Sequence, residues 1–71
     1  MTNTSLLRQM IESRGFRYDY ICKVLGVTYS TLRRKINNMA EFTASEISAF
    51  SALLGLTAED RDRIFFAEKC E

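Results

Sequence analysis

The fold is decided by residues 18–38, which read YDYICKVLGVTYSTLRRKINN. Gly26 divides this stretch, because glycine readily adopts the left-handed conformation that ends a helix. Apolar residues recur four positions apart on both sides of the glycine, at Ile21, Leu25, Leu32 and Ile36. This spacing is typical of helices that bury one face. The stretch therefore predicts a helix-turn-helix, with one helix over about residues 18–25, a turn at 26–28 and a second helix to about residue 37.

Three further helices are expected around this pair. The first covers about residues 4–14, the fourth covers residues 43–54 and a fifth begins at residue 57. Thr43 and Glu46 have the spacing of a capping box, in which each side chain accepts a hydrogen bond from the other residue's backbone N–H. The expected inward residues are Leu6, Leu7, Met10, Ile11, Ile21, Val24, Leu25, Leu32, Ile36, Ile47, Phe50, Leu53, Leu54 and Ile64, with one of Phe65 and Phe66.

Length and composition indicate one small domain that covers residues 1–71. Proline is absent and glycine occurs three times, which favours helices with few breaks and predicts a compact all-α, five-helix fold. No apolar run reaches the roughly 18 residues of a membrane span. The polar N-terminus has no basic and apolar signal pattern. We therefore expect a cytoplasmic protein without a membrane partner.

The residue types argue against catalysis and metal binding. Histidine, the commonest general base and metal ligand, does not occur in the sequence. Cys22 and Cys70 lie 48 positions apart, without metal-ligand spacing, and are expected to be reduced thiols. There is no phosphate-cradling glycine loop and no nucleophile motif. We expect no enzyme activity, no cofactor, no metal and no small-molecule substrate.

Charge is distributed unevenly along the chain. The formal net charge is only +1. Residues 1–38 contain seven bases and two acids, a net charge of +5, whereas residues 39–71 contain three bases and seven acids, a net charge of −4. Such asymmetry predicts one surface for an anionic partner and another surface for a different use.

The candidate DNA-contacting residues lie mainly on the outward side of the helix after the turn. Hydroxyls at its start suit phosphates, arginines can pair with guanine, and an asparagine near its end can bond a phosphate or a base. The candidates are Thr28, Tyr29, Ser30, Thr31, Arg33, Arg34 and Asn37, with Arg17 and Lys23 as phosphate contacts from the preceding helix. The alternative for the basic residues is an ordinary solvated helix face. Lys35, at the inner edge, is the weakest candidate among the three consecutive bases.

Residues 21–38, ICKVLGVTYSTLRRKINN, resemble the helix-turn-helix of the Cro/C1 (XRE) repressor family. Gly26 stands at the turn glycine, Val27 and Leu32 stand at the apolar positions after it, and Cys22 stands where that family usually has alanine. The continuation from Glu41 resembles small phage-encoded Cro-like proteins. The resemblance implies a repressor-like fold and the DNA contacts named above, with the helix after the turn in the major groove.

The sequence thus predicts a sequence-specific DNA-binding transcriptional regulator of phage or prophage origin, whose partner is an operator in double-stranded DNA. A homodimer would span two half-sites about 34 Å apart, and the acidic half of the chain is where its contact is expected. The alternative is an antirepressor or protein-interaction module that keeps the fold without binding DNA. The low net charge motivates that alternative.

Overall fold

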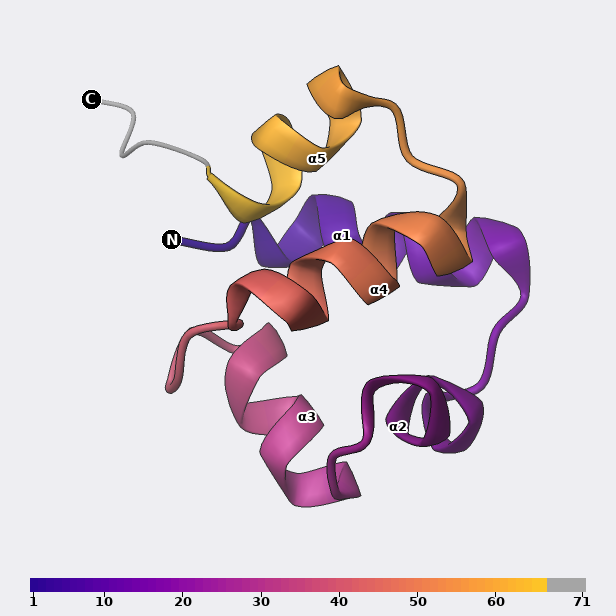
Figure 1. Ribbon diagram of the computed structural model, residues 1–71, viewed down its shortest axis with the longest axis vertical. Coiled ribbons are helices and arrows are strands. Elements are labelled where there is room, and N and C mark those ends of the chain that lie inside the picture. Colours follow the sequence, from indigo (N-terminus) through magenta and orange to yellow (C-terminus); the bar gives the residue numbers. More distant parts are fainter. Residues whose placement is uncertain (67–71) are drawn as a thin grey trace.

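The computed structural model describes residues 1–66, which form five α-helices and no strand (Figure 1). The helices are α1 (Thr4–Arg14), α2 (Tyr18–Leu25), α3 (Tyr29–Ile36), α4 (Ala44–Leu54) and α5 (Ala58–Phe65). The predicted all-α, five-helix fold is confirmed. The third helix ends one residue earlier than expected, because Asn37 leaves the helical conformation and forms the C-cap.

Side-chain caps explain where four of the helices begin. Asn3, Thr28, Thr43 and Thr57 each accept a hydrogen bond from a backbone N–H of the first turn that follows. The predicted capping box is present, because Glu46 also accepts from the Thr43 N–H at 2.9 Å. These caps satisfy donors that a helix start leaves without partners. The helix starts are therefore set by local sequence.

The core lies between the five helices and draws on all of them. Its buried members are Leu7, Ile11, Ile21, Leu32, Ile36, Ile47, Phe50, Leu54, Ile64 and Phe65. Phe42 packs edge-on against the rings of both Phe50 and Phe65, with ring centroids 5.7 and 5.2 Å away. Of the two adjacent phenylalanines, Phe65 is buried and Phe66 is 54% exposed. This confirms the expected division between them.

Val24 is not an inward residue, so that prediction was wrong. Its side chain is 40% exposed. A helix turns by about 100° per residue, which places Val24 on the side of Ile21 that is opposite to Leu25 and at the outer edge of the buried face. Cys22 and Tyr18 complete that face instead, and both are half-buried against the core.

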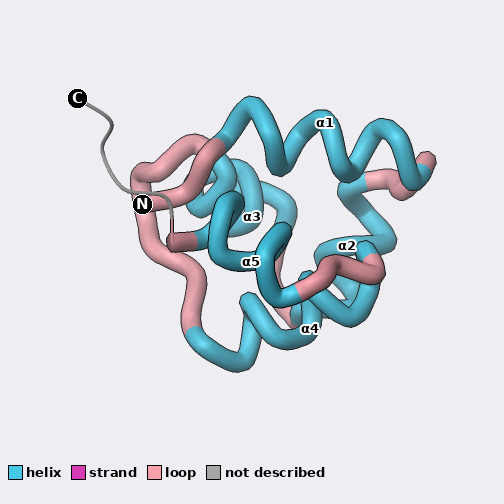
Figure 2. The backbone as a smooth tube through the Cα atoms, turned by 90° about the horizontal axis from the view of Figure 1, so that it is seen from above, coloured by secondary structure: helices cyan, strands magenta, loops and turns pink. Residues whose placement is uncertain are grey.

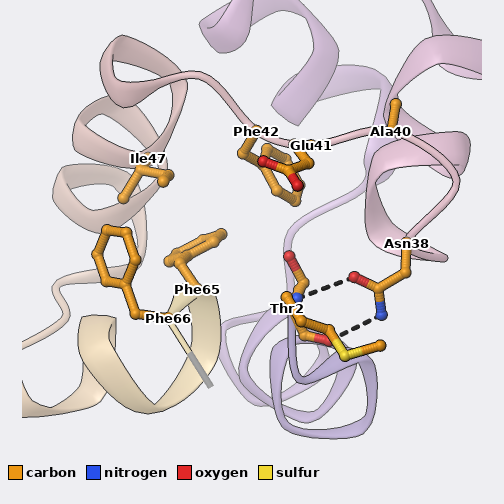
Figure 3. A pocket seen from close by; sticks show the side chains of 9 residues that line it. Thr2, Asn38, Ala40, Glu41, Phe42, Ile47, Phe65 and Phe66 are labelled. Atoms are coloured by element: carbon orange, nitrogen blue, oxygen red, sulfur yellow. Dashed lines mark hydrogen bonds between the residues drawn. The ribbon is translucent and has the colours of Figure 1, made fainter. Parts of the chain in front are cut away.

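The N-terminal segment forms hydrogen bonds with both the C-terminal end of α3 and the C-terminal end of α5. The Asn3 N–H donates to the Ile64 carbonyl at 2.7 Å, and the Thr4 hydroxyl donates to the Ile36 carbonyl at 2.6 Å. Asn38 has a φ of 65° and exchanges two hydrogen bonds with the Thr2 backbone, each 2.9 Å long (Figure 3). Asparagine tolerates this left-handed conformation better than most residues. The orientation of α3 is thus fixed at its C-terminal end as well as at the turn.

In the view from above, α1 runs along one edge of the molecule and α4 along the other (Figure 2). Each of the two also packs against α5, and α2 packs against both α3 and α4. None of the helices within residues 1–66 combines the length and the apolar character that crossing a membrane requires.

Candidate nucleic-acid interface

The predicted turn is present between α2 and α3. Gly26 has a φ of 73°, and its N–H donates to the Cys22 carbonyl at 2.8 Å, so that α2 ends there. Val27 follows and packs, half-buried, against the core. Ile21 and Leu32 are both fully buried, which holds the two helices in fixed positions. The surface that α3 presents is therefore determined by a rigid support on its inner side.

The outward face of α3 is polar and basic. Leu32 and Ile36 point into the core, and the helical repeat of about 100° per residue places Arg34 nearly opposite both of them. Ser30 and Asn37 lie on the same outward side, and all three side chains are exposed. This outward face is about as wide as one helix, and the opposite side of α3 packs against the core.

Arg33 lies at the flank of this face, next to an aromatic pair. Its guanidinium carbon is 5.9 Å from the centroid of the Tyr29 ring, a distance at which a cation and a ring attract each other. The Tyr29 ring in turn lies 6.1 Å from the ring of Tyr18 on α2. Tyr29 is 49% exposed. The first turn of α3 and the start of α2 thus form one continuous surface.

The four hydroxyl groups at the start of α3 differ in what they can offer a ligand. The Thr28 hydroxyl accepts from the Thr31 N–H at 3.3 Å and donates to the Thr31 hydroxyl oxygen at 2.9 Å. The Thr28 hydroxyl oxygen therefore caps the helix, and its proton is engaged by the Thr31 hydroxyl. Thr31 is half-buried, whereas Tyr29 and Ser30 are exposed and form no hydrogen bond through their hydroxyls within residues 1–66. Tyr29 and Ser30 are the two hydroxyls best placed to donate to a phosphate.

Arg17 and Lys23 lie apart from the α3 residues. Both are exposed on or beside α2, where Arg17 is the N-cap residue. No hydrogen bond, ion pair or ring contact in the described part of the chain joins either side chain to α3. They add positive charge to the same half of the molecule without belonging to the α3 face.

Lys35 is bound to α4. Its ammonium group forms an ion pair with Glu46 at 2.5 Å, and the two side chains are only 12% and 13% exposed. Burial alone would raise the pKa of Glu46, but hydrogen bonds from Lys35 and from the Thr43 N–H outweigh it and lower the pKa below its ordinary value. Lys35 therefore connects α3 to α4 at the inner edge of α3.

A contact that the sequence did not reveal lies at the end of α3. Arg8 on α1 donates from Nη2 to Oδ1 of Asn37 at 2.6 Å. The two residues are 29 positions apart, and only the tertiary fold brings them together. The Asn37-Asn38 pair was the one local signal here, because asparagine is common where a chain leaves a helix.

Cys22 is a half-buried thiol beside the turn. Burial raises its pKa above the ordinary value, and the carboxylate of Asp19 adds to that effect. A raised pKa disfavours the reactive thiolate. Cys70 lies outside the described residues. Within residues 1–66 no group of three acidic or cysteine side chains is arranged to hold a metal ion.

Two open hollows flank Phe66, and none of the residues expected to contact DNA lines either of them. The larger, of about 330 Å³, lies between the first two residues, the 38–42 loop and α5 (Figure 3). The smaller, of about 280 Å³, lies between α4 and α5 and includes Ser51 and Arg61. Neither hollow contains a cluster of titratable groups comparable to an active site.

Comparisons with protein-family models, with curated proteins and with solved structures found no match to this chain.

Proposed function

We propose that this protein is a sequence-specific DNA-binding transcriptional regulator that inserts α3 into the major groove of its operator. The observation that carries the proposal is the basic outward face of α3, which is supported by a helix-turn-helix and contains no carboxylate. Arg33 and Arg34 form no ion pair with any acid among residues 1–66. An α-helix fits the major groove, where base edges offer a distinct pattern of donors and acceptors.

Each group on this face has a chemical role in the proposed complex. Arg34, directly outward, pairs with O6 and N7 of a guanine. Arg33 and Tyr29 lie along the wall of the groove. The ring of Tyr29 contacts a thymine methyl group there, or its hydroxyl forms a hydrogen bond with a phosphate. Ser30 and the first N–H groups of α3 bind a phosphate. Arg17 and Lys23 add phosphate contacts from α2.

The regulatory mechanism we propose is occupancy. The bound protein would exclude polymerase or a competing repressor from the operator. The resemblance to the Cro/C1 family supports this mechanism and a phage or prophage origin. A homodimer would place two α3 helices about 34 Å apart, in successive major grooves on one side of the duplex.

Selection from a random duplex library tests the proposal and yields the operator at the same time. We expect recovery of a common sequence, with two-fold symmetry if two copies bind. The variant with Arg33→Ala and Arg34→Ala should recover no common sequence while it keeps its helical circular dichroism. Recovery of the same sequence by that variant would mean that α3 is not the reading helix.

A protein-interaction module is the second candidate, because the net charge is only +1 and Phe66 is exposed between two hollows. The two candidates differ in their dependence on salt. DNA binding releases counterions and weakens steeply as salt rises. A protein that retains no duplex at low salt would favour the interaction module.

A further inference from the structure

Arg8 extends the basic surface of α3 onto α1. It lies outside the helix-turn-helix, and its guanidinium reaches Asn37 at the end of α3. Both side chains are exposed. Glu12 stands four residues further along α1, at a spacing that favours ion pairs. Arg8 nevertheless forms no ion pair with Glu12 or with any other carboxylate of residues 1–66.

The hydrogen bond to Asn37 leaves the positive charge of Arg8 and most of its N–H donors available to a ligand. Asn37 is neutral, so the positive charge of Arg8 is not compensated by its partner. A guanidinium carries five N–H donors, and the hydrogen bond to Asn37 uses one of them. The remaining donors can bind an anion next to Asn37.

The same hydrogen bond orients the carboxamide of Asn37. Because arginine only donates, the Asn37 atom that faces it must be the oxygen, and the two N–H donors of the amide are directed elsewhere. An asparagine that reads adenine needs its oxygen and its nitrogen together. Asn37, with its oxygen engaged, is suited to an acceptor such as a phosphate oxygen.

Building on the proposed function, we propose that Arg8 and Asn37 together bind one phosphodiester group of the duplex. Arg8 supplies the charge and holds Asn37 as a donor, and Asn37 supplies a second hydrogen bond. The groove contact of α3 would then be anchored at both ends, by Ser30 at the start and by this pair at the finish. A purely structural role, in which Arg8 only stabilises the C-terminal end of the α3 dipole, would leave the salt dependence of DNA binding unchanged.

The test compares Arg8→Gln with Arg63→Gln in the full chain. Arg63 is a matched control, because it is an exposed arginine on α5, away from the proposed interface. Affinity for the selected duplex and for a mixed-sequence duplex is measured by fluorescence anisotropy over a range of salt concentrations. Circular dichroism and melting temperature show whether each variant is folded.

We expect Arg8→Gln to reduce the slope of log affinity against log salt by about one, the value for one phosphate contact. Affinity for both duplexes should fall by the same factor, since a phosphate contact carries no sequence information. Arg63→Gln should leave the slope as in the unmodified protein. Asn37→Asp, which would neutralise Arg8 and remove the amide donors, should weaken binding further than Arg8→Gln.

Two results would overturn this assignment while the proposed function stands. One is an unchanged salt slope for a folded Arg8→Gln variant, when the unmodified protein binds DNA. The other is a change of preferred base in that variant, which would make Arg8 a base contact. Absence of duplex binding by the unmodified protein would instead remove the proposed function and this inference together.

Discussion

Within the described part of the chain, residues 1–38 and residues 39–66 contribute equally to the core and very differently to the surface. Each half supplies five of the ten apolar residues that are buried within residues 1–66. Both described arginines of the second half, Arg61 and Arg63, form ion pairs with neighbouring acids. Of the seven bases in the first half, only Lys35 forms an ion pair within residues 1–66. The net charge of +1 is therefore the sum of a basic half, at +5, and an acidic half, at −4, and it describes neither.

A substitution in the core that the two halves share should have the largest effect, which is on the free energy of unfolding. Phe50 on α4 is fully buried and contacts the rings of Phe42 and Phe65. Phe50→Ala should cost about 3–5 kcal/mol, which is most of the stability of a domain this small. Thermal unfolding followed by circular dichroism should show loss of helix in both halves together. If residues 1–38 kept their helices in this variant, the two halves would be independent folding units.

The outward face of α3, which we propose contacts the bases, gives the next largest expected effect. Arg34→Ala should weaken binding to the selected duplex by about 1–3 kcal/mol, or roughly 5- to 150-fold, because it would remove the proposed bidentate contact to guanine. Arg33→Ala should cost less, since Arg33 lies at the flank against Tyr29. Titration of the duplex with each variant measures both. The control is Arg63→Ala, which removes the same charge from the acidic half. Equal losses for all three variants would show that only total charge matters.

The ion pair between the halves should make stability depend on pH. The pKa of Glu46 is lowered in the folded protein. The contribution of this carboxylate to the free energy of unfolding is therefore present above about pH 4.3, the ordinary pKa of glutamate, and is lost as the pH falls through the lowered pKa of the folded state. Glu46→Gln should therefore reduce the free energy of unfolding by about 1–2 kcal/mol at neutral pH and by much less under acidic conditions.

Urea unfolding at neutral and acidic pH measures this difference. The control is Glu59→Gln, because Glu59 is 78% exposed and its ion pair with Arg63 is longer, at 3.5 Å. Exposed pairs of this kind contribute little to stability. If Glu46→Gln lowered the free energy of unfolding by the same amount at neutral and at acidic pH, the charged carboxylate would not be what stabilises the fold.

Two of the three glycine caps, one taken from each half, give the smallest expected effects on stability. Gly26 and Gly55 have φ values of 73° and 67°, and a Cβ atom on either would meet no other atom within 4 Å. Alanine at either position should cost about 1 kcal/mol, from the left-handed backbone alone. Urea unfolding should give similar losses for the two variants. A much larger loss for Gly26→Ala would mean that the turn is under a constraint beyond its backbone conformation.

The fold was predictable because its determinants are local. The caps at Thr28, Thr43 and Thr57 each act within one turn, and the apolar spacing identifies the inward face of each helix. Val24 was misplaced because an apolar residue at the edge of a helix face is ambiguous without knowledge of the neighbouring helices. Local sequence therefore identifies the helices better than it identifies the borders of their buried faces.

The candidate site was predictable only in part. Helical periodicity places Ser30, Arg34 and Asn37 on one face of α3. Periodicity does not reveal that Thr28 uses its hydroxyl as a cap and as a donor to Thr31, or that Lys35 is bound to Glu46. The contact of Arg8 with Asn37 spans 29 positions and depends on the packing of α1 against the rest of the fold. Such long-range polar contacts have no periodic pattern in the sequence.

The basic surface is tested most directly by the salt dependence of binding to the selected duplex. Binding by the unmodified protein should weaken steeply as salt rises, with a slope that reflects several phosphate contacts. The variant with Arg33→Ala and Arg34→Ala should lose its preference for the selected duplex over a mixed-sequence one. A protein that binds no duplex at low salt, or a double variant with unchanged preference, would contradict the assignment of α3 as a DNA-reading helix.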